Sequence, residues 1–168
     1  MQELDIYYIT NENRITMTED NMKQLIASIW RTPDGTILES KNVHDYVSHD
    51  DKVAHETYFV DGGTQYIRTS TNTLPMADLC AHANDHIAEV RKKLRRGTLM
   101  SDGSRRWVIL KNMSDKHLES CITYNIERGM GSDNPFTIQY IRELAYRFEN
   151  NITVPEHEYT DEDERLEL

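Results

Sequence analysis

The sequence predicts an α+β fold, in which a small antiparallel sheet of three to five strands packs with about four helices in a single domain. Short β-prone runs separated by turn residues occupy positions 36–70, and apolar residues recur at helical spacing in most of the remaining chain. The length of 168 residues fits one domain of about 100–200 residues. We therefore expect one globular α+β domain over residues 1–152.

A strand and a helix are expected near the N-terminus. Residues 5–10 (DIYYIT) have the Ile and Tyr content of a strand. Thr16 then begins the capping-box pattern Thr-Met-Thr-Glu. The apolar positions that follow at helical spacing are Met22, Leu25, Ile26, Ile29 and Trp30. This helix should end before Pro33, because Asp34-Gly35 is a turn sequence.

Residues 36–70 are expected to form an antiparallel meander of three or four strands. Four short β-prone runs, ILES, VHDYVSH, TYFV and QYIRTS, are separated by polar or glycine-containing turns. Asp61-Gly62-Gly63, between the last two runs, is a hairpin sequence.

Three further helices and one strand are expected in the C-terminal part. The first helix opens at Leu74-Pro75, with proline near the first helical position, and Gly97 ends it. The turn Asp102-Gly103 leads to a strand at residues 107–110. Ser114 caps the next helix, which Gly129 or Gly131 ends, and Asn134-Pro135 begins the last one. The apolar faces of the three helices are Met76, Leu79, Cys80, Ala83, Ile87, Val90 and Leu94; Leu118, Cys121, Ile122 and Ile126; and Phe136, Ile141, Leu144, Ala145 and Phe148.

The end of the chain is strongly acidic. Residues 155–168 contain seven acidic residues and one basic residue, Arg165, a net charge of −6 out of −10 for the whole chain. Such a segment has too few apolar residues to offset its ordering entropy. We expect residues 153–168 to form an acidic disordered tail.

Composition indicates a reduced, cytoplasmic protein. The chain contains only Cys80 and Cys121, both among apolar residues, where a reduced cysteine behaves as a small hydrophobe. There is no signal-peptide pattern and no run of about 20 apolar residues, so we expect no membrane contact. Phosphate-binding glycine loops, dinucleotide fingerprints and Gly-x-Ser-x-Gly motifs are absent from the sequence, which leaves an enzyme unsupported and predicts no cofactor.

Two groups of histidines are weak candidates for a metal or catalytic site. In the first, His44-Asp45 and His49-Asp50-Asp51, with His55 nearby, lie in a predicted strand and turn. Residues five apart on a strand point to opposite faces, so His44 and His49 diverge unless a bulge intervenes. Turn and edge-strand roles explain this group better.

The second histidine group lies on the helix predicted after Pro75. His82 and His86 are four residues apart and would share one helical face, which is a workable metal pair. A third ligand would have to come from elsewhere, with Glu89 or His44 as candidates. The polar flank of an amphipathic helix explains the pair equally well, so we predict no metal site.

A concentrated basic segment is the strongest chemical feature. Its cations lie within 16 residues that hold one acid, Asp102, and give a local charge of +6: Arg91, Lys92, Lys93, Arg95, Arg96, Arg105 and Arg106. Two or three cations suffice to complement a helix C-terminus. The surplus favours an anionic partner, and the arginine fork matches phosphate. Double-stranded DNA is disfavoured, because the overall charge of −10 repels it.

We predict an anion site built from these arginines. The turn Asp102-Gly103 would bring the two arginine pairs toward one another. The predicted ligand-binding residues are Arg91, Arg95, Arg96, Arg105 and Arg106, with Arg68 and Tyr66 added from the sheet.

Two stretches resemble uncharacterised accessory proteins of large tailed bacteriophages of the T-even type. Residues 34–70 carry Asp-Gly-Thr, His-Asp-Tyr, Asp-Gly-Gly and Tyr-Ile-Arg patterns, and residues 95–149 carry Met-Ser-Asp and Glu-Leu-x-Tyr-Arg patterns. The family has no activity that transfers functional residues. The resemblance implies a context, the host cytoplasm, in which such proteins counter host defences or redirect host machinery, commonly as inhibitors or as sponges for cyclic-nucleotide signals.

These observations lead to one hypothesis and two alternatives. The hypothesis is a phage-encoded, non-catalytic binding protein for host takeover or counter-defence that sequesters a phosphorylated ligand, such as a nucleotide, or inhibits a host protein. One alternative is an enzyme acting on a nucleotide or nucleic acid, with His44, Asp45 and His49, or His82 and His86, at its centre. The other is an acidic mimic of nucleic acid that acts through its tail. The sequence leaves a homo-oligomer open.

Overall fold

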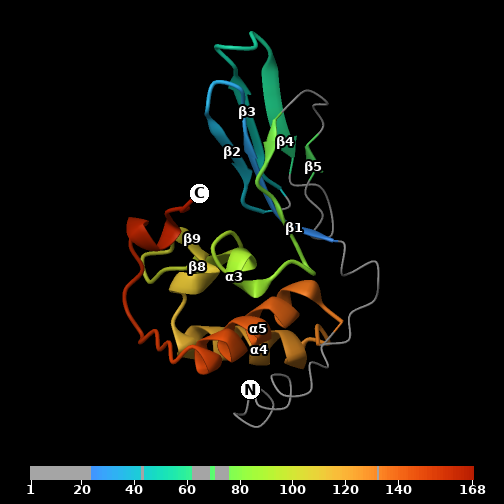
Figure 1. Ribbon diagram of the computed structural model, residues 1–168. Helices are drawn as coiled ribbons and strands as arrows, with labels where there is room; N and C mark the ends of the chain where they lie inside the picture. The colour runs from blue at the N-terminus through green and yellow to red at the C-terminus, as the bar shows by residue number, and fades with distance from the viewer. Residues whose placement is uncertain (1–23, 43, 62–68, 71–75, 132) are drawn as a thin grey trace. The chain divides into compact units, whose positions relative to one another are not determined.

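The computed structural model describes residues 24–42, 44–61, 69–70, 76–131 and 133–168 (Figure 1). It confirms the α+β class: small antiparallel sheets are combined with three α-helices in the described residues, one fewer than expected. The chain groups into two compact units, residues 24–82 and a second unit whose described part is residues 83–168. None of the described helices is long and apolar enough to span a membrane.

The first unit is built around strand β1 (Leu25–Arg31). Strand β2 (Ile37–Ser40) pairs antiparallel with β1, and the short strands β6 (Ala77–Asp78) and β7 (Ala81–His82) also pair with it. A meander of β3 (Tyr46–Asp50), β4 (Thr57–Asp61) and β5 (Thr69–Ser70) forms the second sheet of this unit. Leu38, Tyr58 and Val60 are its buried core cluster.

A three-stranded meander within residues 36–70 was predicted correctly, but the first predicted run, ILES, is β2 and pairs with β1 instead, and the last pairing of the meander also differs. Asp61 pairs with Thr69, a wider separation than a tight turn at Asp61-Gly62-Gly63 would give. The predicted strand at residues 5–10 and the predicted cap at Thr16 lie outside the described residues.

The helix predicted across residues 22–30 is wrong in its described part, where β1 is a strand. Ile26, Ala27 and Ile29 are buried, and so is Ser28 between them. Because β1 has neighbours along both edges and is covered on both faces, its apolar residues do not alternate as in a half-exposed strand. A run of consecutive buried residues also contains pairs three and four positions apart, so it matches helical spacing although it forms a strand.

The helix predicted from Leu74 to Leu94 is also wrong. Within the described residues 76–94 the one helix is α3 (Ile87–Val90), and β6 and β7 precede it. Pairing of Ala77 with Arg31, and of Ala81 with Ala27, gives this backbone partners in the sheet. Gly97, expected to end the helix, lies inside a strand instead.

The second unit packs a hairpin with two helices. Strands β8 (Arg95–Leu99) and β9 (Arg105–Ile109) are joined by a turn in which Gly103 has a φ of +85°. A short 3₁₀ helix, η1 (Leu110–Asn112), leads to α4 (Asp115–Glu127), and α5 (Pro135–Glu149) packs against α4. Both caps were predicted correctly: Ser114 accepts the His117 N–H, and Asn134 accepts those of Phe136 and Thr137.

The acidic C-terminal segment is not a disordered tail. This segment contains the 3₁₀ helix η2 (Asp161–Glu164), which contacts β9, and Tyr159 before it is only 8% exposed. The segment begins along α4, where Asp115 donates its N–H to the Val154 carbonyl. One aromatic anchor and complementary charge hold it, although its composition alone favours disorder.

Candidate functional site

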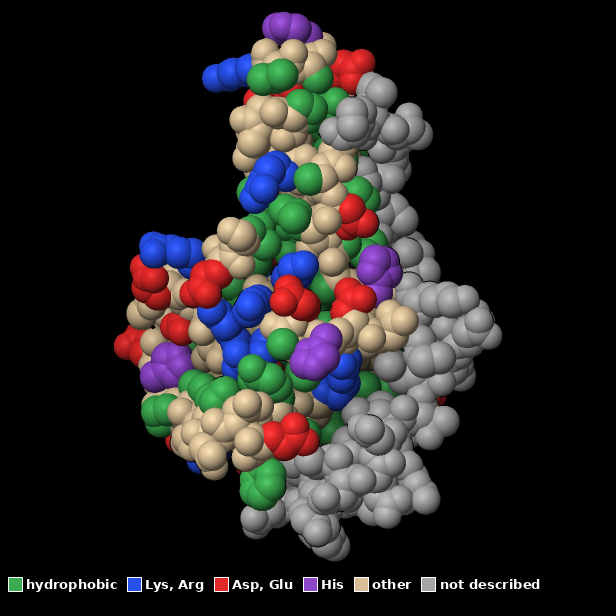
Figure 2. All heavy atoms as spheres, viewed as in Figure 1, with side chains coloured by type: hydrophobic (Ala, Val, Ile, Leu, Met, Phe, Trp, Pro, Cys, Tyr) green, Lys and Arg blue, Asp and Glu red, His purple; other side chains and the backbone are tan. Residues whose placement is uncertain are grey.

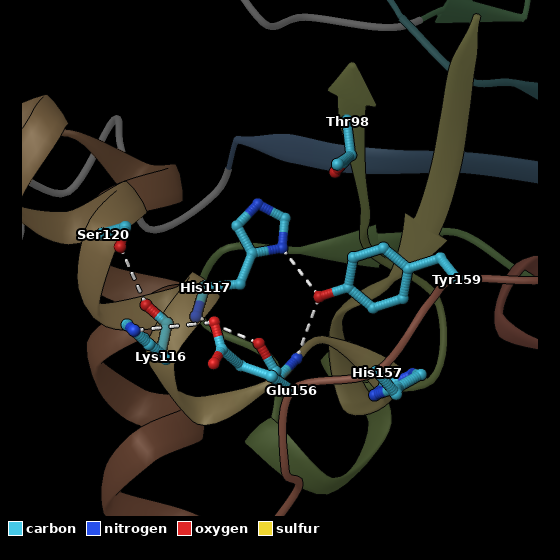
Figure 3. Close-up of a pocket in the computed structure, with 8 residues that line it drawn as sticks. Thr98, Lys116, His117, Ser120, Glu156, His157 and Tyr159 are labelled. Atoms are coloured by element: carbon cyan, nitrogen blue, oxygen red, sulfur yellow. Dashed lines mark hydrogen bonds and ion pairs between the residues drawn. The ribbon is translucent and has the colours of Figure 1, made fainter. Parts of the chain in front are cut away.

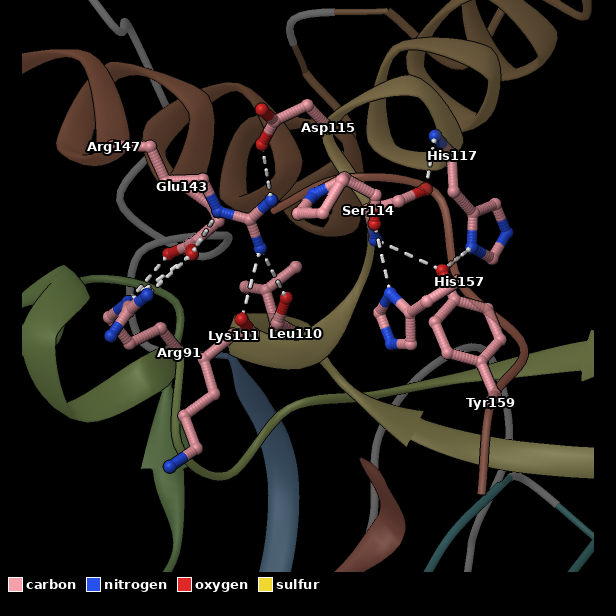
Figure 4. Close-up of polar contacts among 11 residues, drawn as sticks. Arg91, Leu110, Lys111, Ser114, Asp115, His117, Glu143, Arg147, His157 and Tyr159 are labelled. Carbon is pink, nitrogen blue, oxygen red and sulfur yellow. Dashed lines mark hydrogen bonds and ion pairs between the residues drawn. The ribbon is translucent and has the colours of Figure 1, made fainter. Parts of the chain in front are cut away.

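Arg91, one of the six arginines predicted to bind an anion, belongs to a buried ion-pair network. Its guanidinium donates to both carboxylate oxygens of Glu143 at 2.9–3.2 Å and lies over the ring of Tyr146. Arg147 donates to Glu143 and to Asp115 (Figure 4). Glu143 is completely buried, and removing one partner of such a network leaves an uncompensated charge. Arg91 therefore joins α3 to α5.

Arg95 and Arg106 bind the chain's own C-terminal segment. Arg95 donates to the carbonyls of Trp107 and Glu164, both at 2.7 Å. Arg106 donates to the carboxylates of Asp161 at 2.9 Å and Glu164 at 2.8 Å. The basic hairpin and the acidic segment thus neutralise one another.

The hairpin places Arg96 and Arg105 on opposite faces. Arg96 pairs with Val108 and Arg105 with Leu99, and successive side chains alternate between faces. The half-buried Arg96 lies over Tyr140, and the exposed Arg105 lies near the Trp107 ring. Neither has an acidic partner among the residues that the structure describes. The predicted convergence of the two arginine pairs on one cleft is therefore wrong.

His49 lies in a cluster with two carboxylates in the first unit. One ligand atom each of Asp34, His49 and Asp51 lie within 4.8 Å of one another, a spacing that suits a metal ion. Hydrogen bonds already use these atoms: His49 Nε2 is 2.7 Å from Asp34, and three backbone N–H groups donate to Asp51. The Thr36 hydroxyl and then His49 hold the pKa of Asp34 far below its ordinary value. The cluster ties two turns together.

The other candidate histidines have separate roles. His44 is exposed in the turn before β3, and the neighbouring Asp45 accepts the Lys41 N–H. His82 lies on β7, whereas the His86 ring accepts the Ala88 N–H as the cap of α3. Since His82 lies on β7 and His86 caps α3, the two rings of this weak candidate pair do not share a helical face.

Tyr66 and Arg68, the two additions proposed from the sheet, lie outside the described residues.

A cavity of about 310 Å³ lies between the first turn of α4, the hairpin and the C-terminal segment (Figure 3). Its volume is near the lower end of the roughly 300–1,000 Å³ common for small-molecule sites. The residues that line it are Thr98, Ser114, Lys116, His117, Ser120, Glu156, His157 and Tyr159. Hydroxyl, imidazole and ammonium groups dominate this lining, and several of them are already hydrogen-bonded within the protein.

His117 presents a ring N–H to the cavity. Its Nδ1 is 2.8 Å from the Tyr159 hydroxyl, which accepts the Ser114 N–H at 3.0 Å. We assign the Tyr159 proton to the bond with Nδ1, which places the proton of the neutral ring on Nε2. Figure 3 shows the Nε2 edge of the ring turned away from Tyr159.

The two histidines of the cavity have opposite pKa shifts. Burial, and then the charge of Arg96, lower the pKa of His117, so its ring is neutral at pH 7. The Pro155 carbonyl, and then the Asp163 carboxylate, raise the pKa of His157 by accepting from its two ring nitrogens. The wall therefore combines a neutral donor with a ring that favours the imidazolium form.

Two further cations act on this cavity. Lys116 lies at the rim, 72% exposed and 3.7 Å from Glu156. Arg96 lies on the same hairpin face as Thr98, which lines the cavity, and its charge reaches His117. The cations outnumber the Glu156 carboxylate, which favours an anionic ligand.

Sequence reasoning missed this cavity because Glu156, His157 and Tyr159 belong to the segment expected to be disordered. The Ser114 cap does place His117 in the first turn of a helix, and Arg96 was among the predicted anion-binding residues. The usable indication was the opposite charge of residues 91–106 and 155–168, which favours docking of one on the other.

The chain matches no protein-family model, no curated protein and no solved structure.

Proposed function

We propose that this protein is a non-catalytic binding protein that holds the phosphorylated end of a small molecule, such as a nucleotide, in the cavity beside α4. The observation that carries the proposal is the wall itself: the His117 Nε2–H, the His157 ring and Lys116 surround one space, with Arg96 nearby. Phosphate oxygens accept several hydrogen bonds and are stabilised by such cations.

Arg96 supports an anion more strongly than the other arginines of its segment. Arg91, Arg95 and Arg106 are already bound to carboxylates or carbonyls. Arg96 is partly buried against the Tyr140 ring, and its Nη1 lies 3.4 Å from the Tyr140 hydroxyl. A desolvated guanidinium without a carboxylate partner in the described structure is stabilised when an anion approaches.

The size of the cavity suits part of a nucleotide. Its volume of about 310 Å³ accommodates a phosphate with its sugar, and the exposed rim at Lys116 and Glu156 leaves room for a larger ligand to project into solvent. Nucleoside phosphates, cyclic oligonucleotides and ADP-ribose derivatives all carry such an end.

The arrangement favours binding over catalysis. Because His117 Nδ1 accepts from Tyr159 and Nε2 is protonated, the ring offers no free base to a ligand. The Ser120 hydroxyl donates to the Lys116 carbonyl, and Glu156 is exposed beside a lysine. These groups lack the base that activates a nucleophile.

The resemblance to accessory proteins of T-even-type phages supports a biological context for this binding. In the host cytoplasm, a protein that holds a phosphorylated signal without consuming it acts as a sponge and blunts a defence response. The acidic-mimic alternative is weakened, because Asp161, Glu164 and Glu167 are engaged by Arg106 and Lys111.

Calorimetry against nucleoside monophosphates, cyclic di- and trinucleotides and ADP-ribose derivatives tests the proposal. A charge-assisted hydrogen bond contributes roughly 1.5–3 kcal/mol, so Arg96→Gln and His117→Ala should each weaken binding by about tenfold or more. Arg105→Gln is the matched control, because it removes the same charge from the opposite hairpin face and should leave affinity unchanged.

Two results would reject the proposal. One is a wild-type protein that binds nothing in this panel; the other is equal affinity for wild type and both site variants. Mass spectrometry of the ligand after incubation separates binding from catalysis: unaltered ligand is expected, and a converted ligand would favour an enzyme.

A further inference from the structure

Two carboxylates of the C-terminal segment are held by a cradle on β9. One carboxylate oxygen of Glu164 accepts the Trp107 N–H at 2.8 Å, and the other accepts from Arg106 at 2.8 Å. Asp161, three residues earlier, accepts from the same guanidinium at 2.9 Å. The cradle therefore recognises two acidic side chains at i and i+3.

Peptide carbonyls of the same segment are also bound. Arg95 donates to the Glu164 carbonyl at 2.7 Å, and the Asn112 side chain donates to the Asp163 carbonyl at 3.1 Å. Contacts to main-chain carbonyls at a fixed offset from the carboxylates suit a polypeptide, whereas a nucleic-acid backbone offers phosphates alone at that spacing.

The outermost contacts of this end are exposed, whereas Glu164 at its centre is 24% exposed and Arg95 is buried. The Asp161 side chain is 94% exposed, and Glu167, which pairs with Lys111 at 2.7 Å, is 67% exposed. Exposed ion pairs are screened by salt and contribute little. The buried anchor, Tyr159, precedes them, so residues 160–168 can leave β9 while Tyr159 keeps its place.

The hairpin has more contact surface than the segment uses. Leu99 is 69% exposed, and Arg105, its cross-strand partner, is also exposed. In Figure 2, blue and red side chains lie intermixed over the part of the molecule that carries the C-terminal segment. The exposed Leu99 and Arg105 leave room for a partner segment to contact the hairpin beyond the positions that residues 160–164 occupy.

We propose that Arg95, Arg106, Trp107 and Asn112 form a docking surface for an acidic segment of a partner protein. Residues 160–164 of the chain itself occupy this surface until the partner segment displaces them. The partner is recognised by two carboxylates three residues apart and by its main-chain carbonyls. None of these four residues lines the cavity, and Asp163 of the segment contacts His157, which does.

Fluorescence anisotropy of a labelled peptide that copies residues 158–168, added to the full chain, tests exchange. Asp161→Asn with Glu164→Gln weakens the internal segment and should raise affinity for the peptide by at least about tenfold over wild type. Glu158→Gln with Glu162→Gln is the matched control. It removes the same charge from the same segment, but Glu158 is exposed and Glu162 pairs only with Arg165 among the ion pairs of the described residues.

Adding Arg106→Gln to the Asp161→Asn, Glu164→Gln protein should abolish peptide binding. Glu164→Gln alone provides a milder variant, and thermal unfolding confirms that each protein is folded. Equal peptide affinity in wild type, test and control proteins would overturn the proposal. Tighter binding of an oligothymidylate of equal charge would overturn it as well, and would identify a nucleic-acid surface.

Discussion

The pKa of His117 is the measurable quantity that responds most directly to charge in the cavity. Burial and then Arg96 hold its pKa below the ordinary 6.5, while His157 across the wall has a raised pKa. A phosphate bound between them would change both values, since an anion stabilises the imidazolium form of each ring.

Arg96→Gln should raise the pKa of His117 toward its ordinary value, because one of the two causes of the shift is removed. An NMR titration of the His117 Cε1–H resonance measures this. Arg105→Gln, on the opposite face, should leave the titration unchanged. An identical titration in the Arg96 variant would show that Arg96 does not act on the cavity.

The pH dependence of stability should separate the two rings. His117 has a folded pKa below its unfolded value, so its contribution is present above about pH 6.5 and is lost as pH falls through the folded pKa. His157 has a raised pKa, so its contribution is present below that pH and is lost as pH rises through the folded pKa. Denaturant unfolding between pH 5 and 8 should show a smaller acid loss for His117→Gln than for wild type; equal losses would contradict the assignment.

At the scale of elements, the hairpin depends on a glycine that sequence reasoning assigned to a helix end. Gly97 is directly opposite Trp107, and a Cβ at this position would lie 2.7 Å from the Trp107 ring. The absence of a side chain therefore lets the indole lie across the strand.

Gly97→Ala should lower the free energy of unfolding by about 1–3 kcal/mol, the usual cost of overpacking. Trp107→Leu combined with Gly97→Ala should remove most of that penalty, since the crowded ring atoms are gone. Denaturant unfolding of both single variants and the double variant measures the coupling. Additive losses would mean that the two residues do not collide.

The C-terminal segment should behave as part of the second unit. Deleting residues 156–168 removes a buried Tyr159 and its bonds to Ser114 and His117, which should cost roughly 3–5 kcal/mol. Deleting residues 166–168 alone is the control and should cost less than about 1 kcal/mol. A full deletion that unfolds at the wild-type denaturant midpoint would show that the segment does not dock.

At the scale of the whole molecule, local sequence rules correctly predicted the elements whose ends carry a capping side chain or a turn glycine. Ser114, Asn134 and Gly129 fixed the ends of α4 and α5, and Asp102-Gly103 fixed the hairpin turn. The rules failed for β1, where burial of consecutive residues also matches helical spacing, and for residues 76–86, where short strand pairings with β1 replace the expected helix.

The site illustrates a second limit of sequence reasoning. Residues 91–106 and 155–168 carry opposite charge, and each was interpreted alone, one as an anion site and the other as a solvated tail. The structure joins them, so most of the arginines serve the fold and only Arg96 stays near a cavity without a carboxylate partner in the described residues. Long-range docking of charged segments has no local sequence pattern.

The position of the bound phosphate is the central claim, and NMR titration of the wild-type protein tests it most directly. With the tightest ligand of the calorimetric panel, the His117 Cε1–H and Thr98 amide resonances should shift saturably, with the same dissociation constant as the calorimetry, and the pKa of His117 should rise. A ligand that binds with the same affinity but leaves His117 and Thr98 unmoved, and shifts resonances around Asp34 and His49 instead, would contradict the account.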